Sequence, residues 1–143
     1  LDNHNRLDMV FMACEEFEHL QPSDVEFRLE QPNYTVKTLA HLQEKYPTNE
    51  FCLIMGEDNL KTFHKWKNYE VILDNHSLYV YPRKSGGKVE NQFKDHPKIT
   101  RVDAPVIEIS ATFIRDSIKE GKFIKPMLPA KVWEYVIHNN FYK

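Results

Sequence analysis

The sequence has no excess of positive charge, which argues against a nucleic-acid-binding protein. Its 143 residues include 19 lysines and arginines against 21 aspartates and glutamates, for a formal net charge of -2. A chain with this balance has no general electropositive field with which to displace counterions from a phosphate backbone. We therefore expect no nucleic-acid partner.

The sequence also has no long apolar run. No stretch approaches the roughly 20 apolar residues of a membrane-spanning helix, and the first residues lack the pattern of a secretory signal. We expect a soluble protein without a membrane partner. Because the chain starts at Leu1, and its first residues already run into an amphipathic pattern, we expect this start to be a cut.

Cysteine is scarce, and histidine is not arranged for metal binding. Cys14 and Cys52 each lie in an apolar run, which indicates two buried thiols and not a disulfide framework. Such thiols favour a reducing compartment, so we expect a cytoplasmic protein. None of the seven histidines pairs with another histidine or a cysteine at a metal-ligand spacing, and no metal site is expected.

The apolar residues that are present predict an α/β domain. Five segments have the pattern of helices: residues 6–17, 35–46, 58–74, 110–120 and 129–138. Five segments have the pattern of strands: residues 25–29, 51–55, 78–81, 99–102 and 106–109. The runs at 51–55 and 78–81 are typical of parallel strands covered on both faces, and the helical segment between them implies a right-handed βαβ unit. Residues 83–97, around Ser85-Gly86-Gly87, are expected to form a surface loop.

The most informative motif lies where an apolar segment runs into a helix start. Ser110 stands at the N-cap position, Thr112 follows in the first turn, and Arg115 comes about one turn later. The free N–H groups of a helix N-terminus, together with two hydroxyls and a guanidinium, would suit a phosphate. An ordinary serine-capped surface helix explains the same residues equally simply.

A second motif follows the expected strand at 51–55. Gly56 would permit close approach of a ligand to the backbone, and Asp58 could accept hydrogen bonds from a ribose diol at the carboxyl end of the strand. Asp58 could instead cap the helix that comes next.

Two further motifs would suit a small aromatic ring. Trp66, between two lysines, could stack on a flat heteroaromatic ring whose nucleotide carries phosphate, or could be a core residue. Tyr34 and Thr35 follow a turn and begin a helix, where a hydroxyl and backbone N–H groups could hold a small carboxylate or amide. The alternative for Thr35 is an ordinary cap.

In combination and order, these motifs resemble the bacterial nicotinate mononucleotide adenylyltransferases of the nucleotidyltransferase superfamily. The matching segments are Pro32-Asn33-Tyr34-Thr35, Ile54-Met55-Gly56-Glu57-Asp58-Asn59-Leu60, the aromatics Phe63, Trp66 and Tyr69, and Ile109-Ser110-Ala111-Thr112-Phe113-Ile114-Arg115. The Ile-Ser-x-Thr-x-x-Arg element is diagnostic of the superfamily, and the other elements point to its pyridine-nucleotide branch. The resemblance runs from Arg6 to Tyr142.

The resemblance implies one nucleotidyltransferase-like domain over residues 1–143, about the C-terminal three quarters of the family domain. Its fold would be a Rossmann-like parallel sheet with helices on both faces, whose first strand and helix precede residue 1. The implied reaction transfers adenylyl from ATP to nicotinate mononucleotide, giving deamido-NAD and pyrophosphate in NAD biosynthesis. Mg²⁺ would accompany ATP, held mainly by phosphate oxygens and water.

The resemblance also implies three groups of binding residues. The ATP phosphates would contact Ser110, Thr112, Arg115 and, less directly, Arg83. The adenosine and its ribose would contact Gly56 and Asp58. The nicotinate ring and its carboxylate would contact Tyr34, Thr35 and Trp66.

The family's histidine motif, Gly-x-Phe-x-Pro-x-His-x-Gly-His, does not occur in this sequence and would precede residue 1. No catalytic residue is therefore assigned, His64 included, and these residues alone are expected to be inactive. Two alternatives stay open: an adenylyltransferase acting on nicotinamide mononucleotide or pantetheine phosphate, and a non-catalytic nucleotide-binding domain. The sequence also leaves open whether the chain forms a homo-oligomer.

Overall fold

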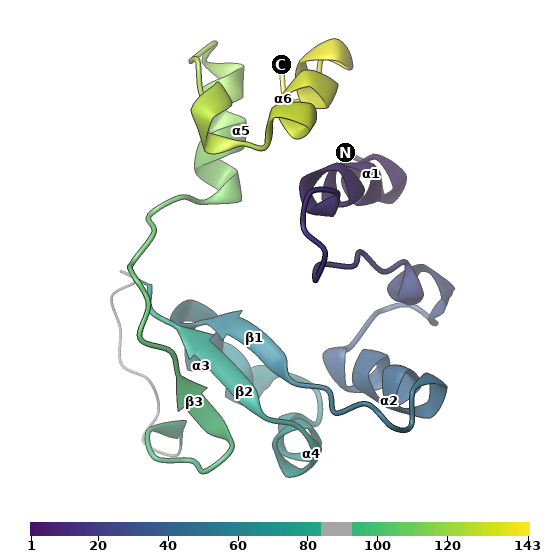
Figure 1. Cartoon of the computed structure of the whole chain (residues 1–143). Helices are drawn as coiled ribbons and strands as arrows, with labels where there is room; N and C mark the ends of the chain where they lie inside the picture. Colours follow the sequence, from purple (N-terminus) through teal and green to yellow (C-terminus); the bar gives the residue numbers. More distant parts are fainter. Residues whose placement is uncertain (84–92) are drawn as a thin grey trace. The chain divides into compact units, whose positions relative to one another are not determined.

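The computed structural model describes residues 1–83 and 93–143 (Figure 1). Contacts divide the chain into two compact units, one formed by residues 25–108 and the other by residues 1–24 together with 109–143. Each unit has its own apolar core. The Ser85-Gly86-Gly87 turn of the expected surface loop lies outside the described residues.

The unit of residues 25–108 is built on a parallel sheet. Its strands, in the order β1-β2-β3, are β1 (Leu53–Gly56), β2 (Leu78–Tyr81) and β3 (Ile99–Arg101). The register pairs Leu53 with Leu78 and Gly56 with Tyr81. The predictions of a parallel α/β sheet and of these three strands are confirmed, with shifts of one or two residues at the strand ends.

Two expectations about the faces of this unit are corrected. β1 lies at the edge of the described sheet, and Ile54 is 77% exposed, so β1 is not covered on both faces here. Phe93, which falls within the expected surface loop of residues 83–97, is buried in the core, where its ring makes T-shaped contacts with the rings of Phe63 and Tyr69. A single aromatic in a polar segment gives no periodic signal, and this is why the sequence pattern missed it.

Helical segments cover the sheet and complete the core of this unit. They are the 3₁₀ turn η1 (Val25–Arg28), α2 (Thr35–Lys45), α3 (Glu57–Thr62), the 3₁₀ turn η2 (Phe63–Lys65) and α4 (Tyr69–Asn75). α2 ends two residues before Pro47, which has no N–H with which to continue a helix. Leu60, Phe63 and Leu78 are completely buried and hold the crossover from β1 to β2 against the sheet.

The predicted strand at residues 25–29 is wrong, because this segment begins with the 3₁₀ turn η1. The segment is not part of the sheet formed by the described residues, and Phe27 stays exposed. Glu26 instead makes two hydrogen bonds, one to a residue before α2 and one to a residue of α2. Its carbonyl accepts from Asn33 Nδ2 (3.0 Å), and its carboxylate accepts from Thr38 Oγ1 (2.8 Å). Local polar contacts therefore decide the conformation that the alternation left open.

The predicted strand at residues 106–109 is also wrong, since these residues have no regular structure. Pro105 cannot donate to a ladder at the start of the segment, and Ile107 is 64% exposed. The prediction of buried thiols fails at Cys52, which is exposed because β1 begins only at Leu53, whereas Cys14 is half-buried.

The second unit is helical. It contains α1 (Asn3–Cys14), α5 (Ala111–Lys119), the 3₁₀ turn η4 (Lys125–Met127) and α6 (Ala130–His138), close to the predicted helices. Its core consists of Ile114, Ile118, Ile124, Val132 and Val136. α1 packs on α6, and Tyr135 on α6 donates a hydrogen bond to Asn5 on α1 (2.7 Å). The N–H of Asn5 also bonds to Asp2, which caps α1 and has its pKa lowered by this contact.

We predict that Gly121→Ala destabilises the protein through its backbone alone. Gly121 ends α5 in the left-handed region (φ +70°), where the N–H of Lys122 bonds to the carbonyl of Ser117 (2.9 Å), and a Cβ there would meet no atom within 4 Å. Because a left-handed conformation costs a residue with a side chain about 1–2 kcal/mol, the free energy of unfolding should fall by about 1 kcal/mol in urea denaturation. The free energy of unfolding should fall less in Gly121→Asn, because asparagine tolerates the left-handed conformation better. A Gly121→Ala variant with the same free energy of unfolding as the parent would contradict the prediction.

Candidate functional site

The first group of site residues lies where β1 and β2 end. Because the two strands are parallel, their carboxyl ends meet at one edge of the sheet, and the register places Gly56 beside Tyr81. Asp58 follows Gly56 in the first turn of α3, and Arg83 follows Tyr81. We call Gly56, Asp58, Tyr81 and Arg83 the sheet-edge cluster.

The absence of a side chain at Gly56 allows Asp58, Tyr81 and Arg83 to lie close to its backbone. A Cβ at Gly56 would overlap Asp58 Oδ1 and would lie 3.2 Å from Tyr81 Oη and 3.3 Å from Arg83 Cγ. The N-cap position of α3 is Gly56, and no side chain caps this helix, so Asp58 is not the cap that the alternative reading suggested. Its carboxylate instead folds back over the glycine at the strand end.

Arg83 forms a loose ion pair with Asp58. The distance from Arg83 Nε to Asp58 Oδ1 is 3.9 Å, and the two side chains are 29% and 47% exposed. Arg83 Nη1 also donates to the carbonyl of Ile107 (3.5 Å). The resemblance placed Arg83 with the ATP phosphates, whereas the structure places its guanidinium beside the carboxylate assigned to the ribose. A contact this long leaves Asp58 able to accept hydrogen bonds from a hydroxyl-bearing ligand.

Sequence reasoning missed two other features of this edge. One is the hydroxyl of Tyr81, which faces Gly56. The position of this tyrosine at the carboxyl end of a predicted strand could have identified it as a candidate. The other is the ion pair between Arg101 Nη1 and Glu57 Oε1 (2.8 Å), which joins the end of β3 to the start of α3. This pair helps to fix α3 over the strand ends.

The second group of site residues lies at the start of α2. Tyr34 is the N-cap residue and makes no side-chain cap bond, while its carbonyl accepts from the N–H groups of Lys37 (2.8 Å) and Thr38 (3.2 Å). Thr35 is the first helical residue, so it is not the cap either. The helix start therefore offers its first N–H groups without a capping side chain.

Trp66 follows the 3₁₀ turn η2 and is half-buried. Its ring meets the edge of the completely buried Phe63 ring at a centroid distance of 5.3 Å. One part of the indole packs on the core and the rest stays exposed, so the core role is confirmed in part and stacking on a ligand stays a prediction. The next residue, Lys67, places its Nζ 4.3 Å from the centroid of the Tyr34 ring, which brings the Trp66 segment to the start of α2.

The third group lies at the start of α5, in the helical unit. Ser110 is the N-cap residue as predicted, and its Oγ accepts from the N–H of Phe113 (3.1 Å). Thr112 Oγ1 accepts from Arg115 Nη2 (3.1 Å), so the guanidinium is held over the first turn. All three side chains belong to exposed residues. The arrangement presents two hydroxyls, a guanidinium and a helix N-terminus to solvent.

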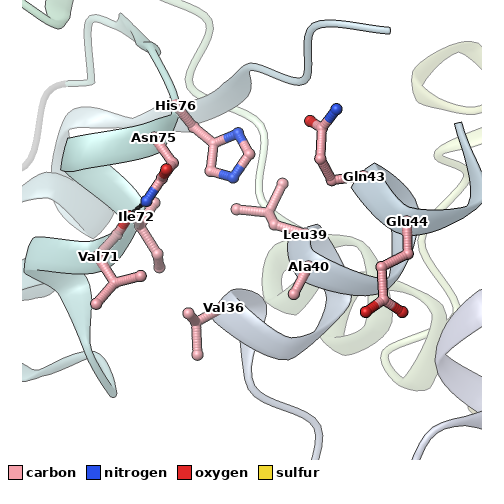
Figure 2. Close-up of a pocket in the computed structure, with 9 residues that line it drawn as sticks. All are labelled: Val36, Leu39, Ala40, Gln43, Glu44, Val71, Ile72, Asn75 and His76. Carbon is pink, nitrogen blue, oxygen red and sulfur yellow. Dashed lines mark hydrogen bonds between the residues drawn. The ribbon is translucent and has the colours of Figure 1, made fainter. Parts of the chain in front are cut away.

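A cavity of about 470 Å³ lies between α2 and α4 (Figure 2). Val36 and Leu39 of α2 face Val71 and Ile72 of α4 across it, and His76 also lines it. His76 Nδ1 is bonded to the carbonyl of Phe51 (2.9 Å). None of the residues assigned to ATP or nicotinate lines this cavity.

Within residues 1–83 and 93–143, no group of three or more histidine, cysteine or acidic side chains is arranged to hold a metal ion. Among the helices of the same ranges, none has the length and apolar character to cross a bilayer.

Comparisons with known proteins agree on one family. The cytidylyltransferase-like family pattern matches residues 1–117. A probable nicotinate-nucleotide adenylyltransferase of Christiangramia forsetii is 68% identical over 143 residues, which are 100% of this chain and 74% of the relative. Its counterpart in Flavobacterium johnsoniae is 64% identical with the same coverage. The structure of Plasmodium falciparum nicotinic acid mononucleotide adenylyltransferase complexed with NaAD has a TM-score of 0.78 at 17% identity, covering 99% of this chain and 75% of that one, and supports the fold.

We predict that Phe63→Leu destabilises the protein and loosens Trp66. Truncating a buried phenylalanine to alanine costs about 3–5 kcal/mol, so the smaller change to leucine should lower the free energy of unfolding by roughly 2 kcal/mol. In a Trp133→Phe background, the emission of Trp66 should shift to the red as its edge contact is lost. Phe123→Leu, at a residue that is 75% exposed, is the matched control and should cost under about 0.5 kcal/mol. Equal losses in the two variants would refute the role of Phe63.

Proposed function

The chain belongs to the nicotinate-nucleotide adenylyltransferases of the cytidylyltransferase-like family, and from this premise we propose how its residues serve the reaction. The reaction joins the phosphate of nicotinate mononucleotide to the α-phosphorus of ATP, releases pyrophosphate and forms deamido-NAD in NAD biosynthesis. The observation that carries the proposal is the sheet-edge cluster, in which a buried glycine makes room for a partly exposed carboxylate at the ends of parallel strands.

The sheet-edge cluster binds the adenosine side of ATP. Asp58 accepts hydrogen bonds from the ribose hydroxyls, and Gly56, which has no Cβ, leaves the room in which that carboxylate lies at the strand end. The loose contact between Arg83 and Asp58 supports this role, because a ribose hydroxyl can replace a 3.9 Å ion pair at little cost. The Tyr81 hydroxyl, which lies beside the same face of Gly56, is a second polar group for the same ligand.

The start of α5 binds phosphate. Ser110 keeps a hydroxyl hydrogen to donate, and Arg115, steadied by Thr112, supplies a charge-assisted contact to an oxygen that gains negative charge during transfer. Arg83, whose guanidinium lies beside Asp58, adds positive charge at the sheet-edge cluster. Catalysis in this proposal rests on positioning and charge neutralisation, without a covalent enzyme intermediate.

Mg²⁺ arrives with ATP in this proposal. When bound with ATP, the ion would supply positive charge that neutralises the phosphates. Hydroxyls and a guanidinium at the start of α5 fit the phosphate oxygens and not the cation, so no residue of this chain is assigned as its ligand.

The start of α2 binds the nicotinate moiety. The exposed part of Trp66 stacks on the pyridine ring, and Thr35 with the backbone at Tyr34 receives the carboxylate at the uncapped helix start. The proposal assigns no catalytic residue within this chain. The reaction takes place in the cytoplasm in this proposal, where ATP is supplied.

We predict that Arg115→Ala in the full-length enzyme lowers kcat/KM for adenylyl transfer at least tenfold. The loss of a charge-assisted contact to phosphate costs about 1.5–3 kcal/mol. The measurement is pyrophosphate release at varied ATP concentration. Lys119→Ala, one turn further along α5, removes the same charge away from the helix start and should leave the rate nearly normal. Near-normal turnover by Arg115→Ala would reject the assignment.

We predict that Gly56→Ala raises the KM for ATP about tenfold, because its Cβ displaces the Asp58 carboxylate from the strand end. The KM for nicotinate mononucleotide should change much less, since the start of α2 is untouched. Gly121→Ala is the control for a glycine substitution outside the site. If Gly56→Ala left the KM for ATP unchanged, the assignment of the sheet-edge cluster to ATP binding would be wrong.

A further inference from the structure

Lys67 is held in a defined place by the chain around it. It lies between η2 and α4, where Trp66 is extended (φ -73°, ψ 144°) and Asn68 is left-handed (φ 52°, ψ 45°). Asparagine tolerates this left-handed conformation better than most residues do. The path directs the lysine back over the Tyr34 ring, with 4.3 Å from Nζ to the ring centroid. At this distance the ammonium is attracted by the face of the ring.

The contact places a positive charge at a helix end that is already positive. Tyr34 is the uncapped N-cap of α2, so the ammonium lies over the ring of the residue at which that helix starts. In the described part of the chain, no carboxylate is recorded within 4.0 Å of Lys67 Nζ. Glu26, which accepts from Thr38 Oγ1, puts negative charge near the same helix start. Lys37, in the first turn of α2, is paired with Glu30 (3.4 Å), so Lys67 adds positive charge that offsets Glu26 for an anionic ligand.

We propose that Lys67 is a specificity-determining residue that makes the enzyme prefer the acid mononucleotide over the amide. Its ammonium, fixed over Tyr34, attracts the carboxylate of nicotinate, whereas the neutral amide of nicotinamide gains little from it. This inference rests on the proposed function, because it assumes that the pyridine ring binds at Trp66 and Thr35. Beyond the proposed function, it names Lys67 as the side chain that distinguishes the charged carboxylate from the neutral amide.

The test compares two substrates in the full-length enzyme at saturating ATP. For each variant, kcat/KM is measured with nicotinate mononucleotide and with nicotinamide mononucleotide. Lys67→Met keeps the aliphatic stem and removes the charge, and it should lower the acid-to-amide ratio of kcat/KM about tenfold, almost entirely through the acid. Lys67→Arg keeps the charge and the contact with the ring, and it should restore most of the ratio.

Lys45→Met is the matched control. Lys45 makes the same type of contact with Tyr46, with 5.2 Å from Nζ to the ring centroid, at the opposite end of α2. The length of the helix places it roughly 15 Å from the helix start, where its charge is largely screened. The acid-to-amide ratio of this variant should equal that of the parent enzyme.

Each result separates this inference from the function on which it rests. If the parent enzyme uses the acid and Lys67→Met leaves the ratio unchanged, or loses both substrates equally, the role of Lys67 is overturned and the function stands. If the parent enzyme uses neither mononucleotide, the proposed function fails and this inference fails with it. Circular dichroism checks folding, and Lys67→Gln takes the place of Lys67→Met if the latter does not fold.

Discussion

The parallel pairing of β1 with β2 is the constraint on which the rest of the site depends. It brings two strand ends to one edge of the sheet and sets Gly56 beside Tyr81. The register is fixed by burial, because Leu78 and Val80 point into the core, and a slip of one residue would turn them to the opposite face. The buried crossover around Phe63 then ties the strand ends to the segment that carries Trp66.

Both proposed anion-binding places use the same physical feature, the N-terminus of a helix, and they differ in the side chains added to it. At α5, Ser110 caps the helix and Arg115 is steadied by Thr112, which suits phosphate oxygens. At α2 no side chain caps the helix, and Lys67 places an ammonium over the ring of the N-cap residue Tyr34, which suits a carboxylate on a flat ligand. The helix dipole attracts either anion, so selectivity comes from the side chains.

Much of this architecture could be predicted from local pattern alone. β2 and the Ser110 cap were predicted to the residue, because a short apolar run and a serine before a helical period are strong local signals. The strand predicted at residues 25–29 from alternating apolar and polar residues was wrong, because a strand also needs a neighbouring strand to pair with. Glu26 forms hydrogen bonds with Asn33 and Thr38 instead. Contacts between distant residues, such as Lys67 with Tyr34, leave no periodic trace in one sequence.

The most direct test of the account is a crystal structure of the full-length enzyme with a non-hydrolysable ATP analogue. The central claim is that the strand ends hold the nucleoside, so the ribose hydroxyls should lie within hydrogen-bond distance of Asp58, with the sugar over Gly56. The account would be contradicted if the adenosine occupied the cavity between α2 and α4, or any other place that left Asp58 facing Arg83 alone.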